Sequence, residues 1–193
     1  MARFHFLVRL AAAGLCGCLT MLDLRWAAAE AYRVDSVHSS VMFRIKHLNT
    51  SFAWGRFNEI SGTVDLDGAD GSLDVEVQVD SIDTKDAKRD QHLKGPDFFS
   101  AKQFPTISFK STKVTKTDEA AYDVEGTLTL HGVSRPITVR LERTGMNPGL
   151  MGGRILGVAG EFRIKRSDYR MRFMLAGLSD EVLVIVSLEC AAK

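Results

Sequence analysis

The chain has 193 residues, of which 45% are hydrophobic and 25% are charged, and its formal net charge at pH 7 is +1. That length suits one domain with a core large enough to fold without disulfide or metal staples. The near balance of charges excludes the strong basic footprint that a nucleic-acid partner requires.

The first 29 residues have the layout of a cleavable signal peptide. A basic start containing Arg3 precedes a charge-free apolar run at 10–22, and three alanines at 27–29 provide a cleavage site. The apolar run is too short to span a bilayer. We expect cleavage after Ala29, with Ala31 as the second choice, and export of a soluble mature domain at 30–193.

Export changes the meaning of the cysteines. Cys16 and Cys18 would leave with the leader, so Cys190 becomes the one thiol of the mature chain and an internal disulfide is impossible. We expect Cys190 to be a small buried apolar residue on an alternating strand. Pairing between chains or modification is the alternative in an oxidising compartment, and both a monomer and a homodimer stay open.

Apolar and polar residues alternate with period two along most of the chain, which indicates half-buried β-strands. The clearest case runs from Leu73 to Val79, where every second residue is apolar. The expected strands, about eight in number, lie at 41–45, 63–67, 73–79, 106–114, 122–130, 137–141, 162–164 and 182–188. The alternation changes phase between Val79 and Ile82, which predicts a β-bulge near Asp80.

The fold class is all-β and antiparallel. Turn residues separate the strands at hairpin spacing, and no amphipathic helix is long enough for a βαβ crossover. One-sided strands in a single domain must close on each other as a barrel or a sandwich. Glycines inside strand-like segments favour a barrel, because they allow sharp coiling; they are Gly55, Gly62, Gly126, Gly157 and Gly160.

Residues 89–109 interrupt the strand pattern. A short polar helix ends at a Gly-Pro pair, and Phe98, Phe99 and Phe104 follow it. Exposed aromatic surface on this scale is costly, so it must enter a core or cover an apolar ligand. We expect a short helical plug between strands, at one end of the barrel.

Several motifs follow one another in a fixed order between residues 32 and 189. They are Tyr32-Arg33-Val34-Asp35, Arg89-Asp90-x-His92-Leu93, Asp97-Phe98-Phe99, Phe104-Pro105-x-Ile107-x-Phe109, Gly126-x-Leu128-x-Leu130-His131-Gly132-Val133 and Arg166-x-Asp168-Tyr169. Their order and spacing resemble the YceI-like family of bacterial periplasmic lipid- and polyisoprenoid-binding proteins. Arg170 departs from the family pattern, which commonly has glycine there, so a turn that needs positive φ is in question at this position.

The resemblance implies a lipocalin-like antiparallel β-barrel that holds a polyisoprenoid, an isoprenoid quinone or a fatty chain in its lumen. It implies a binding or carrier protein rather than an enzyme, with no cofactor apart from a bound lipid such as a polyprenyl or ubiquinone-type chain. The residues expected to line the lumen are Phe43, Ile45, Phe52, Trp54, Phe57, His92, Leu93, Phe98, Phe99, Phe104, Phe109 and Phe162. Ordinary core packing is the alternative for each of them, because inward positions are apolar in filled and hollow barrels alike.

Charged side chains suggest two further contacts. Arg89, His92 and Lys94, beside the plug, could meet a diphosphate, quinone or carboxyl headgroup at the mouth. The alternative is that Arg89 pairs with an aspartate of its own helix, Asp86 or Asp90. A basic run at 163–172 could touch an anionic membrane surface transiently. A solvent-facing strand edge whose charges discourage aggregation is the favoured interpretation of that run.

Catalytic and metal-binding alternatives rest on scattered residues. The four histidines of the mature chain lack the close spacing of a zinc motif, so we expect no metal site. One rival hypothesis is an enzyme that acts on a lipid in the same cavity; its candidates are His38, His47, His92 and Asp97. Another is a filled barrel that acts through its surface as a partner protein in a stress response.

Overall fold

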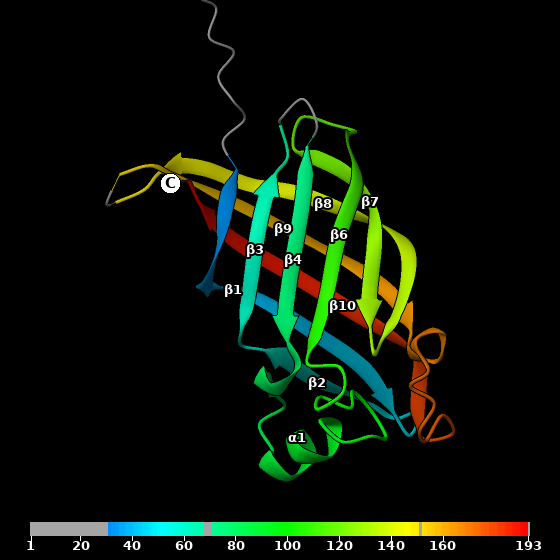
Figure 1. The fold of residues 1–193 in the computed structure, drawn as a ribbon. Coiled ribbons are helices and arrows are strands. Elements are labelled where there is room, and N and C mark those ends of the chain that lie inside the picture. The colour runs from blue at the N-terminus through cyan, green and yellow to red at the C-terminus, as the bar shows by residue number, and fades with distance from the viewer. Residues whose placement is uncertain (1–30, 68–70, 151, 193) are drawn as a thin grey trace, which may run out of the picture.

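The computed structural model describes residues 31–67, 71–150 and 152–192 (Figure 1). The expected signal peptide at 1–29 lies outside these ranges. The helices of the described part are short: α1 is Ala87–Leu93, and the 3-10 turns η1 and η2 are Val79–Ser81 and Arg166–Tyr169. None of the helices described here has both the length and the apolar character needed to cross a bilayer.

Strands form the rest of the regular structure. They are β1 (Tyr32–His47), β2 (Ser51–Phe57), β3 (Ile60–Asp65), β4 (Ser72–Gln78), β5 (Ile82–Asp83), β6 (Thr106–Lys116), β7 (Ala121–Leu130), β8 (Val133–Pro148), β9 (Arg154–Lys165) and β10 (Leu178–Ala191). Within the described residues, eight of these strands close into an antiparallel barrel in the order β1-β3-β4-β6-β7-β8-β9-β10, because β10 pairs with both β9 and β1. The expected lipocalin-like barrel is confirmed.

β1 pairs with two different strands along one of its edges. Its start pairs with β3, whereas its second half, from Val41 to His47, pairs with β2. Between these parts β1 bulges away from β10, since Asp35 lies opposite Glu189 but Ser40 lies opposite Ser187. β2 therefore extends the wall beyond the end of β3, towards α1 (Figure 1).

The alternation read from the sequence corresponds to burial. In β4, Leu73, Val75 and Val77 are buried, and the residues between them are more exposed. The phase change after β4 is real, but a β-bulge was the wrong explanation. The 3-10 turn η1 makes it, because three tightly coiled residues carry the chain from buried Val79 to buried Ile82.

α1 is held by two aspartates. Asp86 is its N-cap, and its carboxylate accepts a hydrogen bond from the backbone N–H of Arg89 at 2.8 Å. Asp90 accepts from the backbone N–H of Thr84 at 2.9 Å, which fixes the helix to the end of β5. Together with the loop at 94–105, α1 lies across one end of the barrel, where the helical plug was expected (Figure 1).

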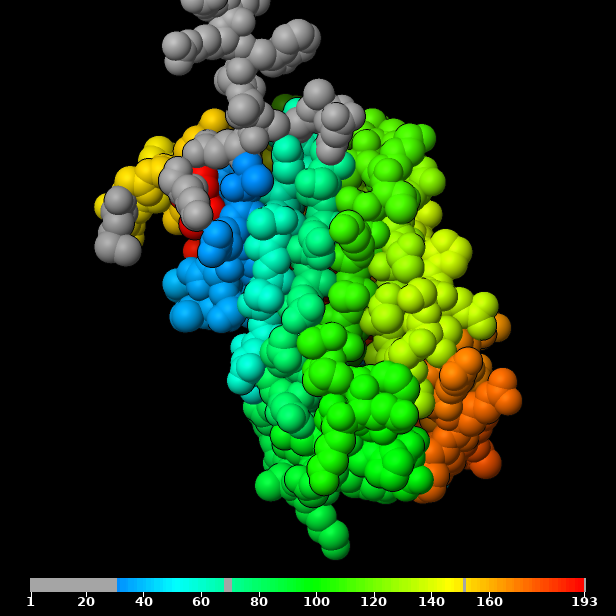
Figure 2. All heavy atoms as spheres, viewed as in Figure 1, coloured from blue at the N-terminus to red at the C-terminus, as the bar shows by residue number. Residues whose placement is uncertain are grey.

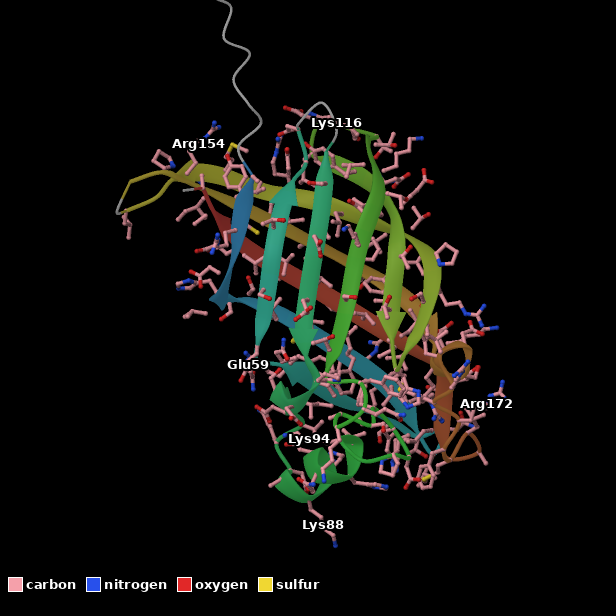
Figure 3. The ribbon with its side chains drawn as sticks, viewed as in Figure 1. Glu59, Lys88, Lys94, Lys116, Arg154 and Arg172 are labelled. Atoms are coloured by element: carbon pink, nitrogen blue, oxygen red, sulfur yellow. The ribbon has the colours of Figure 1, made fainter. Side chains whose placement is uncertain are left out.

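The opposite end of the barrel is packed solid. Its inward side chains have no measurable or almost no exposure; they are Val64, Tyr122, Val124, Leu156, Val158 and Cys190. The Tyr122 hydroxyl donates to a carboxylate oxygen of Asp67 at 2.7 Å, so the polar tip of this buried ring is satisfied. Lys116 and Arg154 mark this end in Figure 3, and Lys88 and Lys94 mark the end with α1.

Candidate functional site

A cavity of about 1050 Å³ occupies the half of the barrel nearest α1. Its wall consists mainly of apolar side chains that alternate inward from the strands, among them Val75, Val77, Ile107, Phe109, Leu128, Val139, Phe162 and Val184. None of the six buried side chains named above for the other end of the barrel borders this cavity. The barrel is thus packed at one end and hollow at the other, which contradicts the filled-barrel hypothesis.

The edge of β2 borders this cavity. β2 pairs with β5 only through Arg56 and Phe57, so residues 51–55 have no strand partner on that side. Cavity-lining residues lie on both sides of the gap, with Ala53 and Gly55 on β2 and Arg89 and His92 on α1. The unpaired edge of β2 and the helix thus face each other across the cavity, and we infer that a lateral opening lies between them.

Three aromatic rings line the inner wall beside this opening. The Phe43 and Phe57 ring centroids are 5.8 Å apart, and Phe99 meets Phe57 edge to face at 5.6 Å. The Phe43 ring lies over Gly55, the residue opposite it on β2, in the space that a side chain there would need. At this point of the cavity wall a large residue on β1, Phe43, therefore lies opposite a small residue on β2, Gly55.

Phe52 and Trp54 lie on the other face of β2. Directly opposed residues of an antiparallel pair share a face of the sheet, and Trp54 is opposite Arg44, whereas Gly55 is opposite inward-facing Phe43. The side chains of Phe52 and Trp54 are 51% and 49% exposed, and the guanidinium of Arg44 stands 4.3 Å and 5.4 Å from their ring centroids. Both residues border the cavity, but their rings lie on the outer face of β2 beside Arg44, contrary to expectation.

The plug reaches the cavity through Leu93, Phe98 and Phe99. Phe98 also forms a three-ring cluster with His92 and Phe173, with edge-to-face centroid distances of 5.1, 5.6 and 5.3 Å. Phe173 belongs to the loop between η2 and β10. This cluster joins α1 to that loop across the end of the barrel, where Figure 2 shows the green and orange segments in contact.

Two expected residues lie outside the cavity lining. Phe104 packs against the β7–β8 turn, with its ring against Gly132 and 4.8 Å from the ring of His131. That glycine has a φ of 70° and leaves a hollow on the turn, which the ring fills. Lys94 does not line the cavity either. All the other residues expected to line the lumen border it.

The expected headgroup residues are held by other partners. The Arg89 guanidinium donates to the hydroxyl and to the backbone carbonyl of Thr84, at 2.7 Å and 2.6 Å, and so does not pair with either aspartate of its helix. His92 Nε2 lies 3.0 Å from a carboxylate oxygen of Asp97. Both Arg89 and His92 stand at the lateral opening, which is where a headgroup would emerge.

Sequence reasoning missed the role of Arg166. The basic run at 163–172 was interpreted as a solvent-facing edge, but Arg166 is only 3% exposed. Its guanidinium donates to four backbone carbonyls, those of Ser179, Met171, Phe173 and Leu178, at 2.7–3.1 Å. Burial lowers the pKa of Arg166, and the charge of nearby Asp180 partly opposes that shift. Its place in a motif of the resemblance was the only signal.

The turn at Arg170 has the positive φ that the sequence put in question. Arg170 has a φ of 64°, the left-handed conformation that glycine adopts most readily. Arg170 is the C-cap of η2, and its backbone N–H donates to the backbone carbonyl of Ser167. The substitution of arginine for glycine therefore leaves the turn in place, at a modest cost in backbone strain.

The histidines and Asp97 do not form one site. His38 lies in the bulge of β1, outside the cavity, with Nδ1 2.8 Å from Asp35 and 3.6 Å from Glu189. The Asp35 carboxylate raises the pKa of His38, and the same hydrogen bond lowers the pKa of Asp35. His47 borders the cavity, and of the four candidates His92 and Asp97 are the two that pair with each other.

Comparisons with known proteins agree with this architecture. The model of the YceI-like domain matches residues 32–190. A UPF0312 protein of Pseudomonas aeruginosa is 36% identical over 168 residues, which cover 84% of this chain and 87% of that protein. A UPF0312 protein of Yersinia pestis has the same identity and coverage.

Solved structures give the same result. The Campylobacter jejuni YceI protein has a TM-score of 0.70 at 34% identity, over 77% of this chain and 90% of that one. Burkholderia cenocepacia BcnA has a TM-score of 0.72 at 27% identity, over 81% and 98% of the two chains. A polyisoprenoid-binding domain from Saccharophagus degradans, 18% identical, shares the fold with a TM-score of 0.68 over 85% and 99%. The chain belongs to the YceI-like family.

Proposed function

We propose that this protein is a periplasmic carrier that holds a long apolar lipid, such as a polyisoprenoid, an isoprenoid quinone or a fatty chain, inside its barrel. The observation that carries the proposal is the largely apolar cavity of about 1050 Å³, for which we infer a lateral opening. That volume lies at the upper end of the range for small-molecule sites. The Saccharophagus degradans neighbour is described as a polyisoprenoid-binding domain, which supports the same class of ligand.

The energetics favour a long chain. Each buried methylene contributes ~0.8 kcal/mol, so roughly 20 methylenes contribute about 16 kcal/mol before costs. Association costs about 4–15 kcal/mol in lost freedom and ordering. A long hydrocarbon therefore binds tightly with little recognition of its headgroup, and a short one does not.

The lateral opening accounts for how such a chain could enter. Phe98 and Phe99 of the plug and Ala53 and Gly55 of β2 stand on its two sides. A hydrocarbon tail can pass between them while its polar head stays near Arg89, at the surface. The expected export signal supports a periplasmic site of action, where apolar lipids need cover from water.

Binding rather than catalysis fits the arrangement of polar groups. Within the described residues, His92 and Asp97 are the pair that the enzyme hypothesis could use, and both are about half exposed. Arg89 is tied to Thr84, and His38 is outside the cavity. Most of the other residues around the hydrocarbon space are apolar, which suits holding a chain.

The first test is the dependence of affinity on chain length. Saturated fatty amides and polyprenols of increasing length are added to delipidated protein, and each dissociation constant is measured. We expect affinity to rise by up to about fourfold per methylene (~0.8 kcal/mol) and then to level off when the cavity is full. At 100 times the dissociation constant, the ligand should stabilise the protein by ~2.7 kcal/mol. Affinity that is independent of length, with no lipid released by solvent extraction, would sink the proposal.

A matched pair of variants tests the location. Val184 on β10 lies opposite inward-facing Phe43 and lines the cavity, whereas its neighbour Ile185 is on the other face of the sheet. Val184→Trp should shorten the longest chain that binds, while Ile185→Trp leaves the length limit unchanged. Because the site is hollow, Val184→Trp should also escape the 1–3 kcal/mol cost typical of overpacking.

A further inference from the structure

Exposed apolar side chains gather at the end of the barrel where the cavity opens. Eight large hydrophobic side chains are exposed in the part of the chain that the structure describes. Two of them, Val37 and Leu150, lie elsewhere. The other six form what we call the rim patch: Leu48, Phe52, Trp54, Phe173, Met174 and Leu175.

The two segments that carry the rim patch are neighbours. The backbone N–H of Leu48 donates to the carbonyl of Gly177 at 2.7 Å, so the β1–β2 turn lies against the loop before β10. The side chains of Leu48 and Met174 both approach Gly177. Phe52 and Trp54 continue the surface along the outer face of β2. In Figure 1 this turn and this loop lie together, on the same side as α1.

The two chain segments that carry the rim patch have charges of one sign. Residues 44–56 and 169–178 contain five basic residues and no aspartate or glutamate; these are Arg44, Lys46, Arg56, Arg170 and Arg172. The whole chain has a formal net charge of only +1, so this is a local excess. Among the described residues none of the five is in an ion pair, and Figure 3 shows Arg172 on the outside of the loop.

We propose that the rim patch docks on the surface of an anionic phospholipid bilayer, so that the lateral opening faces the membrane. This rests on the proposed lipid-binding function and adds the surface from which the lipid is taken or to which it is delivered. Tryptophan and phenylalanine rings favour the interfacial region of a bilayer, and arginine extends its charge to the phosphates while its stem stays on apolar surface. The stacking of Arg44 over Phe52 and Trp54 presents both groups together.

A bilayer fits this surface better than a second copy of the chain. An isologous dimer would bring two copies of the same basic patch face to face, and like charges in contact are costly. An anionic leaflet instead attracts each basic residue, over a range set by the Debye length. The apolar side chains then enter the boundary between headgroups and acyl chains.

Vesicle binding tests the proposal directly. Full-length protein is mixed with vesicles of phosphatidylcholine alone or with about one-third phosphatidylglycerol, and the bound fraction is measured by co-sedimentation. We expect binding to the anionic vesicles that falls steeply as salt is raised. In a Trp26→Phe background Trp54 is the only tryptophan, and its emission should move to shorter wavelength on binding.

Two double variants divide the contributions. Leu48→Asn with Leu175→Ser removes apolar contact at residues that do not line the cavity, and asparagine tolerates the positive φ of Leu48. Lys46→Gln with Arg172→Gln removes charge. Each should weaken vesicle binding by about tenfold or more. The controls, Leu150→Ser for the apolar change and Lys113→Gln with Lys116→Gln for the charge, should change it by less than about twofold.

The outcomes separate docking from cavity binding. Binding of a monomeric fatty amide, measured without vesicles, should be the same in all these variants. Wild-type protein that binds the amide but ignores anionic vesicles would overturn docking and leave the carrier function standing. Wild-type protein that binds anionic vesicles but not the amide would overturn the carrier function and leave docking standing. A concentration-dependent dimer that the Leu48 and Leu175 changes dissociate, with no vesicle binding, would show that the rim patch is a protein interface and would also overturn docking.

Discussion

Phe57 and Phe99 meet edge to face, with ring centroids 5.6 Å apart, and this contact fastens the loop after α1 to the inner wall of the barrel. Phe57 is almost fully buried at the end of β2, whereas Phe99 is partly exposed and borders the cavity. The same ring therefore belongs to the plug and to the ligand space. A chain in the cavity would compete with, or extend, a packing contact that the empty protein already has.

Phe99→Asp should strongly weaken lipid binding. A carboxylate at this position lies beside the hydrocarbon, and an apolar ligand that covers it must remove its water. We expect the dissociation constant for a long fatty amide to rise at least about 100-fold, equivalent to ~2.7 kcal/mol. Fluorescence displacement or calorimetry with delipidated protein measures this.

The control for that change is Arg163→Ala. Arg163 pairs with Glu181 at 2.8 Å on the outer face, where both side chains are about half exposed. Exposed pairs of this kind contribute at most ~1 kcal/mol to stability, and this one is away from the cavity. Equal losses of lipid affinity in the two variants would mean that surface charge, and not the plug, controls uptake.

Arg166→Met should destabilise the end of the barrel that carries the rim patch. The variant leaves four carbonyls without their donor, among them those of Met171 and Phe173. Loss of a buried, fully hydrogen-bonded charge costs about 3–5 kcal/mol when its partners stay behind. Urea unfolding gives the total, and hydrogen exchange should show faster exchange at 170–178 than at β7. Arg166→Lys should rescue little, because one ammonium cannot reach four carbonyls in this arrangement; full rescue by lysine would show that only the charge matters.

The sequence predicts strands well here and predicts the direction of side chains at the opening poorly. In β4 and β7 the inward residues are apolar and mostly buried, whether they line the cavity or the packed end, so alternation and burial coincide. In β2 the cavity is hollow and Phe43 fills the space over Gly55, so small residues face inward and the aromatic rings of Phe52 and Trp54 face outward. A rule that places every large hydrophobic residue inside the barrel therefore assigns the inner and outer faces of β2 the wrong way round.

The positions of two other side chains depend on contacts with residues that are distant in sequence. Phe104 fills a hollow that exists only because Gly132, on a later turn, has no side chain. Arg166 looks like its basic neighbours, and its burial follows from four carbonyls that the loop to β10 turns inward. Neither arrangement has a local periodic signature. Sequence could place the plug and the barrel, but not the partners of these two side chains.

Cys190 should be inert in the folded protein. It is fully buried at the packed end of the barrel, and desolvation, with smaller effects from Glu189 and Asp35, raises its pKa to about 12. The thiolate is the reactive form, so about 1000-fold less of it is present at pH 8 than for a thiol of pKa 9. In a Cys16→Ser, Cys18→Ser background, iodoacetamide should label the protein in urea but not in buffer. Rapid labelling of native protein, or a disulfide-linked dimer on a non-reducing gel, would contradict this placement.

His38→Gln should change stability in a pH-dependent way. The pKa of His38 is raised above 6.5 by its hydrogen bond and charge interaction with Asp35, so the protonated ring stabilises the fold. That contribution is fully present below pH 6.5 and is lost as the pH rises through the higher pKa of the folded state. The pKa of Asp35 is lowered below 3.8, so its contribution is present above pH 3.8 and is lost as the pH falls through the lower folded value.

The pair should therefore contribute most between about pH 4 and 6.5. The urea midpoints of the wild type and His38→Gln should differ more at pH 5.5 than at pH 9, and Asp35→Asn should reduce that pH dependence to the smaller part that Glu189 contributes. NMR titration of the ring gives the pKa directly. Since His38 lies in the bulge of β1, 2.8 Å from Asp35 and 3.6 Å from Glu189, a midpoint at or below 6.5 would mean that the ion pair does not persist in solution.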